Sequence, residues 1–283
     1  MSCEITIKKA LNWAFSLLET QSDSASIDAE VLLQFSLNKN RTFLYTWPDK
    51  VLSNEVWLQF KHFIDLRLKG KPVAHITGTR EFWSLEFQVN DTTLIPRPDT
   101  ELLIETALEL PLADNANVLD LGTGTGAIAL SLASEKNHWR IIAVDKIESA
   151  VDLAIQNRNR LQLEQVAIMQ SDWFDSVSKN TFDLIVSNPP YIDETDIHLT
   201  QGDVQFEPLT ALIASNEGFA DLFYIAEVAR QHLTKSGYLL MEHGYQQGTK
   251  LRQKMQELGY QGVETKIDLG GNERCTIGCW QQT

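Results

Sequence analysis

From residue 117 onward, short apolar runs alternate with segments of helical periodicity, and this alternation constrains the fold more than any other feature. The runs are NVLDLG, RIIAVD, VAIMQSD and FDLIVSN, and segments such as AIALSLASE and ESAVDLAIQNRNRL separate them. Alternating strands and helices predict an α/β chain with a parallel sheet covered by helices on both faces. Two final runs, VETKID and RCTIGCW, predict an antiparallel edge hairpin.

The N-terminal part of the chain has a different periodicity. Apolar residues recur at spacings of three and four around Ile7 to Leu18, Asp28 to Leu37 and Val56 to Leu68, which predicts helices. The run EFWSLEFQVN then alternates apolar with polar residues, as expected of a strand or hairpin. We therefore predict a small helical domain over 1–75, a linker with a β-hairpin over 76–95 and the α/β domain over 96–283.

The charge is unevenly distributed. The formal net charge is -14, and residues 76–283 carry 15 Lys and Arg against 30 Asp and Glu. A protein that binds many phosphates presents a concentrated basic surface, so we expect no stable nucleic-acid binding. An acidic field of this kind favours the approach of a basic partner.

Cysteine content and hydropathy indicate the compartment. Cys3, Cys275 and Cys279 are odd in number and form no CxxC pair, so we predict reduced thiols and no metal site. The N-terminus MSCEITIKKALNWAFSLLET lacks a signal-peptide core, and no stretch approaches the roughly 18 apolar residues of a membrane span. These features predict a cytoplasmic protein with no membrane association.

A glycine-rich turn follows the first strand of the α/β region and leads directly into a helix. It consists of Gly122, Thr123, Gly124, Thr125 and Gly126. The spacing is GxGxG, whereas a dinucleotide site has GxGxxG, and Asp120 two residues before the first glycine would repel phosphate. S-adenosylmethionine fits this chemistry, because it carries an ammonium and a sulfonium and no phosphate. A tight turn without a ligand, with Asp120 as a capping residue, is the structural alternative.

Three further residues follow the next two strands and would reach the same sheet edge. Asp145 ends RIIAVD, nineteen residues after Gly126, where a carboxylate would accept both ribose hydroxyls. Asp172 and Trp173 follow the third strand, where an acid would accept from the adenine amino group and an indole would cover its face. Ordinary packing at the sheet edge is the alternative for Trp173.

The fourth strand ends in Asn188, Pro189, Pro190 and Tyr191. An amide nitrogen is a poor nucleophile, and two hydrogen-bond acceptors converging on its NH2 group would favour attack by nitrogen. The Asn188 side-chain oxygen and the Pro189 carbonyl would be those acceptors, with Pro190 making the turn rigid. Tyr191 would pack against the flat amide and exclude water, so no metal or nucleophilic side chain is required. A simple strand-terminating turn is the alternative.

Seven segments together carry a resemblance to a known family. They are EFWSLEF at 81–87, LIPRPDTE at 94–101, LDLGTGTGAIAL at 119–130, AVD at 143–145, SDWF at 171–174, VSNPPYI at 186–192 and FEPLTAL at 206–212. In these segments, which extend over most of its length, the chain resembles the bacterial HemK/PrmC protein-(glutamine-N5) methyltransferases. NPPY alone also occurs in adenine methyltransferases. The closing segment DLGGNERCTIGCW, with Gly271 and two cysteines, is unusual for the family.

The resemblance implies a Rossmann-like, seven-stranded S-adenosylmethionine-dependent methyltransferase fold, with a mostly parallel sheet, an antiparallel edge hairpin and a small N-terminal helical domain. It implies cofactor contacts at Gly122 to Gly126, Asp145, Trp173 and Asn188, and substrate contacts across Asn188 to Tyr191. The implied substrate is the glutamine of the GGQ motif in class 1 peptide chain release factors, docked partly by the helical domain, in support of translation termination. LIPRPDTE would lie near the cofactor entrance, with no role assigned to Arg97 or Glu101.

Three other functions compete with this interpretation. An N6-adenine methyltransferase acting on DNA or RNA would use the same kind of pocket for a conjugated NH2 group, but the acidic charge disfavours it. An NAD-dependent oxidoreductase would need GxGxxG and a hydride-site residue. A non-catalytic docking domain would not need the glycine turn, Asp145 and NPPY together. We expect an active monomeric enzyme.

Overall fold

The computed structural model describes residues 4–177, 179 and 181–281. The chain divides into two compact units. Unit 1 comprises Met1–Thr79 and Gln201–Phe206, and unit 2 comprises Arg80–Thr200 and Glu207–Thr283. The predicted domain limits at residues 75 and 95 stay predictions.

Unit 1 is helical, as its periodicity predicts. Its helices are α1 (Ile7–Leu18), α2 (Ala25–Leu37), α3 (Arg41–Thr46), α4 (Asn54–Leu68) and α5 (Val73–Thr77). Side-chain oxygens of Thr6 and Ser53 accept from backbone N–H groups in the first turns of α1 and α4, which satisfies donors that the helices leave unpaired. The sequence analysis missed α3 and α5, because helices of six and five residues are too short to show a clear period.

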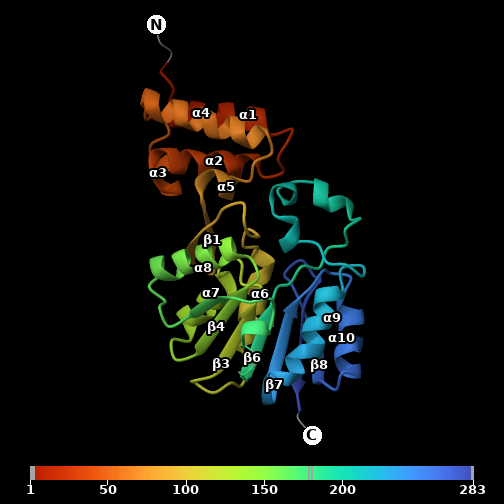
Figure 1. Ribbon diagram of the computed structural model, residues 1–283. Coiled ribbons are helices and arrows are strands. Elements are labelled where there is room, and N and C mark those ends of the chain that lie inside the picture. The colour runs from red at the N-terminus through yellow and green to blue at the C-terminus, as the bar shows by residue number, and fades with distance from the viewer. Residues whose placement is uncertain (1–3, 178, 180, 282–283) are drawn as a thin grey trace. The chain divides into compact units, whose positions relative to one another are not determined.

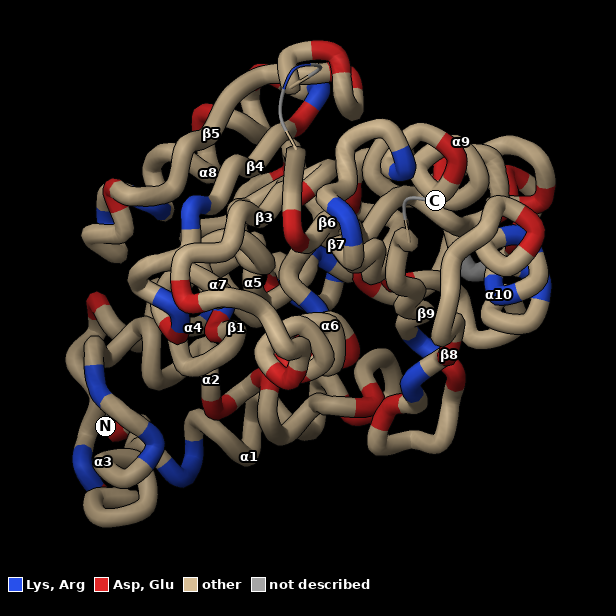
Figure 2. Tube along the Cα trace, turned by 90° about the horizontal axis from the view of Figure 1, so that it is seen from below, with Lys and Arg blue, Asp and Glu red and all other residues tan. Residues whose placement is uncertain are grey.

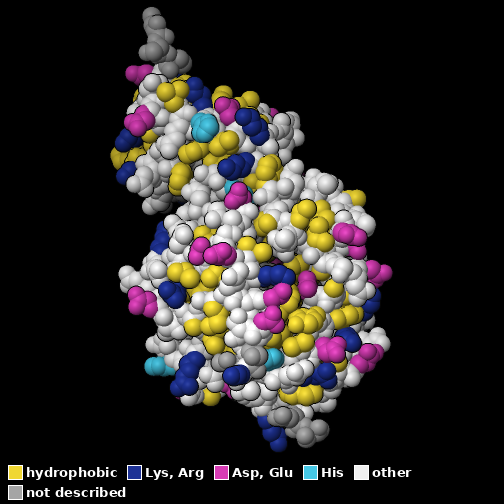
Figure 3. All heavy atoms as spheres, viewed as in Figure 1, with side chains coloured by type: hydrophobic (Ala, Val, Ile, Leu, Met, Phe, Trp, Pro, Cys, Tyr) yellow, Lys and Arg dark blue, Asp and Glu magenta, His cyan; other side chains and the backbone are white. Residues whose placement is uncertain are grey.

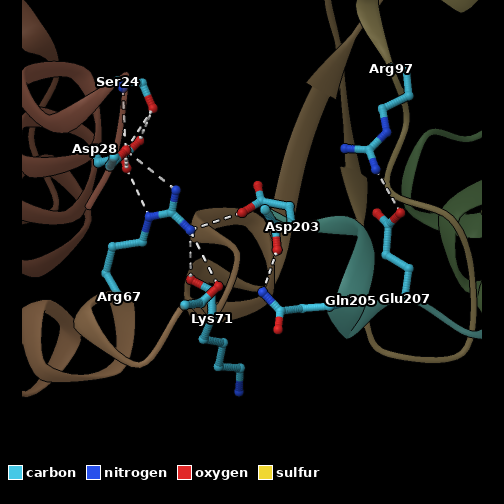
Figure 4. Close-up of polar contacts among 11 residues, drawn as sticks. Ser24, Asp28, Arg67, Lys71, Arg97, Asp203, Gln205 and Glu207 are labelled. Atoms are coloured by element: carbon cyan, nitrogen blue, oxygen red, sulfur yellow. Dashed lines mark hydrogen bonds and ion pairs between the residues drawn. The ribbon is translucent and has the colours of Figure 1, made fainter. Parts of the chain in front are cut away.

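The second segment of unit 1, Gln201–Phe206, is tied to the helices by Arg67 (Figure 4). Arg67 Nε lies 2.8 Å from Asp28 Oδ2 and its Nη1 lies 2.8 Å from Asp203 Oδ1. Phe206 packs so closely on Gly70 that a Cβ there would lie 3.0 Å from its ring. The segment Gln201–Phe206, which lies between β6 and α9 in the sequence, is thus part of the helical unit.

A two-stranded hairpin, β1 (Thr79–Phe82) and β2 (Leu85–Gln88), follows the helices. Phe82 and Phe87 are buried in the core of unit 2. The Asn157 side chain binds the backbone of Gln88 in both directions, with N–O distances of 2.7 and 3.0 Å. The predicted hairpin is confirmed.

Unit 2 contains a seven-stranded sheet with the order β5-β4-β3-β6-β7-β9-β8. The strands are β3 (Asn117–Leu121), β4 (Arg140–Asp145), β5 (Ala167–Gln170), β6 (Phe182–Ser187), β7 (Leu233–Glu242), β8 (Gln261–Ile267) and β9 (Glu273–Trp280). β5, β4, β3, β6 and β7 pair in parallel, whereas β9 runs antiparallel to both β7 and β8. The predicted mostly parallel sheet with an antiparallel edge is confirmed.

Helices cover both faces of this sheet (Figure 1). They are α6 (Glu101–Leu108), α7 (Ala127–Glu135), α8 (Glu148–Arg160), α9 (Ala220–Val228) and α10 (Gly248–Glu257). α6 and α7 contribute to the core on one face, and α9 and α10 to the core on the other. The 3-10 turns are η1 (Pro98–Thr100), η2 (Asp175–Val177), η3 (Ile197–Thr200), η4 (Val204–Phe206), η5 (Leu209–Ala211) and η6 (Ala229–Gln231).

The start of β7 differs from the expectation. The sequence predicts a helix from Gly218 to Leu233 and a strand from Gly237, but the α-helix ends at Val228 and β7 begins at Leu233. Leu233 already pairs with Phe182, and the register shifts before the regular pairing resumes. The intervening Thr-Lys-Ser-Gly stretch resembles a turn locally, and only pairing with a distant strand makes it part of β7.

Two simple observations complete the fold. Cys275 and Cys279 are free thiols, and burial raises the pKa of Cys275 to about 12, while Cys3 lies outside the described residues. Within the described part of the chain, no helix has the length and apolar character needed to cross a membrane.

Candidate active site

A cavity of about 410 Å³ lies within unit 2, at the end of the sheet where β3, β4 and β6 finish. This is the edge at which open α/β sheets hold their ligands, and the volume is in the range of small-molecule sites. Its walls come from the glycine turn after β3, the loops after β4, β5 and β6, the segment between β2 and α6, and η5.

The glycine turn forms one wall of the cavity. Gly122 has φ 72°, and its N–H donates to the carbonyl of Val144 at 2.9 Å. Gly126 has φ 84° and ends the turn at the start of α7, where a Cβ would lie 2.9 Å from Leu130 Cδ1. Of the five predicted residues, Gly126 is outside the cavity lining; the four that line it are Gly122, Thr123, Gly124 and Thr125.

Asp120 lies beneath this turn and does not line the cavity. Its Oδ2 accepts from the Thr123 hydroxyl at 2.6 Å and from the Ala129 N–H at 3.2 Å. Complete burial raises its pKa to about 7, against the effect of these hydrogen bonds. In this structure Asp120 therefore braces the turn, which is the structural alternative considered for it above.

Asp145 ends β4 and faces the cavity. Its Oδ2 accepts from the Gly124 N–H and its Oδ1 from the Ile147 N–H, both at 2.9 Å. Burial raises its pKa, while those backbone donors act in the opposite direction. Each carboxylate oxygen accepts more than one hydrogen bond, so both remain able to accept a ligand hydroxyl.

Asp172 and Trp173 also line the cavity. Asp172 Oδ2 lies 2.7 Å from Lys146 Nζ in an exposed ion pair. Trp173 packs against the apolar core as well, and a Cβ at Gly122 would lie 3.6 Å from its ring. Asp221 from α9 is a cavity residue that the sequence analysis missed; burial, followed by the charge of Asp172, raises its pKa.

The turn after β6 forms a further wall, on which Asn188 and Pro190 line the cavity. Asn188 Nδ2 donates to Thr100 Oγ1 at 3.2 Å, so the amide nitrogen is occupied and Oδ1 is left as an acceptor. Pro189 and Tyr191 are outside the lining. The Tyr191 hydroxyl donates to Glu242 Oε1 at 3.3 Å, and burial raises its pKa.

The segment 92–100 supplies a wall whose contacts the sequence did not reveal, including Arg97 and Thr100. Arg97 Nη2 lies 2.6 Å from Glu207 Oε2 (Figure 4), and the other oxygen of Glu207 accepts from the Ile95 N–H at 3.1 Å. Glu101 accepts from the Trp83 N–H at 2.9 Å and so anchors the hairpin. LIPRPDTE and FEPLTAL are both motifs of the sequence, but no neighbouring residue of either motif indicates that the two contact each other.

The surroundings of the cavity are acidic. Asp145, Asp172 and Asp221 line it together with the cations Arg97 and Lys146, each of which is paired with a carboxylate. Figure 2 shows Lys and Arg interspersed with Asp and Glu along the trace. These acidic side chains fit a ligand with cationic groups, hydroxyls and an aromatic base better than they fit a polyphosphate.

Family models match two parts of the chain. A PrmC N-terminal domain model matches residues 9–78, and a methyltransferase small domain model matches residues 98–206. The hairpin lies in the interval between the two matches.

Curated relatives match nearly the whole length. The chain is 62% identical over 280 residues to a release factor glutamine methyltransferase of Shewanella oneidensis, covering 99% of this chain and 98% of the relative. It is 49% identical over 272 residues to a protein of the same description from Escherichia coli, covering 96% and 98%. Among solved structures, a methyltransferase from Pyrococcus furiosus has a TM-score of 0.55 at 19% identity, covering 76% of this chain and 96% of that one, which supports the fold.

Proposed function

This chain belongs to the release factor glutamine methyltransferase family, and we propose that it transfers a methyl group from S-adenosylmethionine to a glutamine side-chain nitrogen in a class 1 peptide chain release factor. The observation that carries this proposal is the Asn188 amide. It lines the same cavity as the glycine turn, and its nitrogen is held by Thr100 so that its oxygen is left as an acceptor. The target glutamine would be that of the GGQ motif.

The cofactor assignment is supported by the chemistry of the lining. S-adenosylmethionine supplies a methyl group activated by a positively charged sulfur. The turn from Gly122 to Gly126 would let the backbone approach the ligand, and Asp145 would accept the ribose hydroxyls. Asp172 and Trp173 would contact the adenine, the first through its amino group and the second through its face.

The NPPY turn would orient the accepting amide. An amide lone pair is delocalised into its carbonyl, so the two N–H groups need acceptors that direct the nitrogen toward the methyl carbon. Asn188 Oδ1 and the Pro189 carbonyl would be those acceptors, held by the rigid Pro190. Tyr191, anchored on Glu242, would close the site behind the amide. Positioning of this kind contributes several of the roughly 7 to 11 kcal/mol available from orientation.

The reaction balances without a metal or a covalent enzyme intermediate. A nitrogen–carbon bond forms as the sulfur–carbon bond breaks, so the sulfur leaves as a neutral thioether. The methylated nitrogen gives one N–H proton to water, and the product is a neutral secondary amide. The requirement placed on this chain is therefore geometry and hydrogen bonding, which are the features that Asn188 and its neighbours offer.

Unit 1 would contribute to docking of the protein substrate. Ile27, Val31 and Phe35 follow one another at intervals of four on α2 and are exposed, with 61%, 36% and 44% of their surface accessible. Figure 3 shows hydrophobic side chains on the surface of the helical unit. Apolar faces of this kind mark interaction sites. We also propose that the protein acts in the cytoplasm as a monomer.

A methylation assay tests the proposal. The purified protein, labelled S-adenosylmethionine and a recombinant release factor should give label on the release factor, and mass spectrometry should place one added methylene on the GGQ glutamine. A release factor with that glutamine replaced by alanine is the matched control and should stay unlabelled. Label on DNA adenine, with none on the release factor, would establish the N6-adenine alternative instead.

A further inference from the structure

Glu242 is a buried carboxylate directly beside the NPPY turn. β6 and β7 run in parallel with Ser187 opposite Met241, so Asn188, which follows β6, and Glu242, the last residue of β7, lie at the same edge of the sheet. Glu242 is only 2% exposed and does not line the cavity. A charge in such a place is costly unless neighbouring groups stabilise it, so its contacts indicate what it does.

One of those contacts joins the carboxylate to the NPPY turn. Tyr191 donates its hydroxyl to Glu242 Oε1 at 3.3 Å. Oε2 is buried with no hydrogen-bond partner among the described residues, and the Thr100 hydroxyl is a neighbour that lowers the pKa of Glu242. Thr100 Oγ1 in turn accepts from Asn188 Nδ2 at 3.2 Å. Glu242 thus holds Tyr191 directly, and Thr100, which holds Asn188, is a hydroxyl that would donate to the unpartnered oxygen.

Charged groups around Glu242 come from two other elements. Arg274 on β9 favours the charged carboxylate, but it also pairs with Asp99 of η1 at 3.0 Å, and Asp99 opposes ionisation. Tyr191 and Cys275 are the other titratable neighbours, and burial raises the pKa of both. Burial of Glu242 exceeds the favourable contacts and raises its pKa to about 7.

The single hydrogen of the Thr100 hydroxyl makes this arrangement directional. When Glu242 is charged, Thr100 would donate that hydrogen to Glu242 Oε2, and the Thr100 oxygen could then only accept from Asn188. The group that Asn188 turns toward Thr100 must then be its NH2. When Glu242 is protonated, Thr100 is free to donate to Asn188 Oδ1. The Asn188 side-chain amide can then flip, which exchanges the positions of its oxygen and its NH2 group. In the flipped orientation, the Asn188 NH2 group would face the NH2 group of the substrate amide. Both groups are donors, so no hydrogen bond would form between them.

We propose that Glu242 is a positioning residue, which in its charged form makes Thr100 an acceptor for Asn188 and so keeps Asn188 Oδ1 facing the substrate nitrogen. This inference rests on the methyl transfer proposed above. It extends the machinery from the NPPY turn itself to a residue more than fifty positions away in the sequence.

The proposal has a pH signature. Because the required form of Glu242 is deprotonated, kcat should fall as the pH drops below about 7, and the cofactor dissociation constant should not follow it. Protonation of Glu242 would weaken the orientation of the Asn188 amide and leave the glycine turn and Asp145, the proposed cofactor wall, unchanged. A separation of kcat from cofactor affinity is the expected result, and a general loss of structure would not produce it.

The decisive variant is Glu242→Gln, which keeps the shape and removes the charge. We expect kcat at pH 8 to fall about tenfold, as for loss of one charge-assisted hydrogen bond. The decrease of kcat below about pH 7 should be absent in this variant. Its cofactor affinity, measured by calorimetry, should stay at the wild-type value. Glu273→Gln on β9, whose carboxylate pairs with Arg252 at 2.7 Å, is the matched control and should retain wild-type kcat and pH profile.

A pair of variants at Thr100 keeps the test valid if Glu242→Gln does not fold. Thr100→Val removes the hydroxyl and should lower kcat to a similar extent, whereas Thr100→Ser retains the hydroxyl and should restore it. Thermal unfolding of each variant verifies folding.

The two proposals fail in different ways. A wild-type protein that methylates no release factor at any pH contradicts the proposed function. A wild-type protein that is active, together with folded Glu242→Gln or Thr100→Val variants that keep its kcat and the decrease of kcat below about pH 7, overturns the positioning role of Glu242.

Discussion

The glycine turn, which we propose as the cofactor wall of the cavity, and the NPPY turn, which we propose as its substrate wall, are held in place by different kinds of groups. Along the glycine turn, backbone N–H groups bind backbone carbonyls and the Asp145 carboxylate. At the NPPY turn, side chains bind side chains, from Asn188 to Thr100 and from Tyr191 to Glu242. The first wall depends on the backbone of the glycine turn meeting the end of the neighbouring strand β4, whereas the second depends on side chains supplied by more distant parts of the chain.

Each wall also rests on a buried carboxylate. Asp120 lies under the glycine turn and Glu242 lies beside the NPPY turn, and burial raises the pKa of each to about 7. If the two walls are independent, changes at one should alter cofactor affinity and changes at the other should alter turnover. The four predictions below test this separation, beginning with the largest expected effect.

Asn188→Ala should affect turnover most. It removes the acceptor proposed to orient the substrate amide, and loss of one such group typically lowers kcat by about 10² to 10³. Cofactor affinity should change only a few-fold, because the glycine turn is untouched. Steady-state kinetics and calorimetry measure the two quantities, with Asn159→Ala on the exposed end of α8 as the control. A comparable loss of cofactor affinity would show that the walls are not separable.

Asp145→Asn should weaken cofactor binding and leave turnover nearly unchanged. A charged acceptor of ligand hydroxyls becomes a neutral amide, and hydrogen bonds to charged groups contribute about 1.5 to 3 kcal/mol. The dissociation constant of S-adenosylmethionine should therefore rise about 10- to 100-fold, while kcat at saturating cofactor stays close to wild type. Calorimetric titration gives the first value, and Asp152→Asn, exposed on α8, is the matched control. Unchanged affinity would remove Asp145 from the cofactor site.

Gly126→Ala tests the backbone of the cofactor wall. Its φ of 84° is unfavourable for alanine, and the new Cβ would lie 2.9 Å from Leu130 Cδ1 and 3.4 Å from Ala154 Cβ. Strain of about 1 to 3 kcal/mol should lower Tm and weaken cofactor binding about tenfold. Gly271→Ala is an informative control, because Gly271 has φ 82° but a Cβ there meets no described atom within 4 Å. Equal losses in both variants would assign the whole effect to φ.

Asp120→Asn should have the smallest effect, on the pH dependence of stability. The folded pKa of Asp120 is raised above its unfolded value, so its stabilising contribution is complete below the unfolded pKa and is lost as pH rises through about 7. Between pH 6 and pH 8 the wild-type protein should lose about 1 kcal/mol of unfolding free energy through this residue. Urea unfolding at both pH values should show a shallower dependence in Asp120→Asn, and an identical slope would contradict the assignment.

Local patterns were sufficient for most of the fold. The periods of the long helices, the alternation of strands and helices, and the antiparallel final hairpin all follow from hydrophobic patterning, because burial of one face imposes it. α3 and α5 are too short to carry a period, and the first residues of β7 resemble a turn. Their structures depend on contacts with other elements, such as the pairing of Leu233 with Phe182.

The sequence by itself determined that the segments following the predicted parallel strands meet at the carboxyl edge of the sheet, because such strands bring the residues that follow them to one edge. It could not determine that Thr100 accepts a hydrogen bond from Asn188, that Glu242 accepts one from Tyr191, or that Glu207 pairs with Arg97. Those contacts join residues between 51 and 110 positions apart. Only the packing of strands, loops and helices decides which polar side chains are buried together and must satisfy one another.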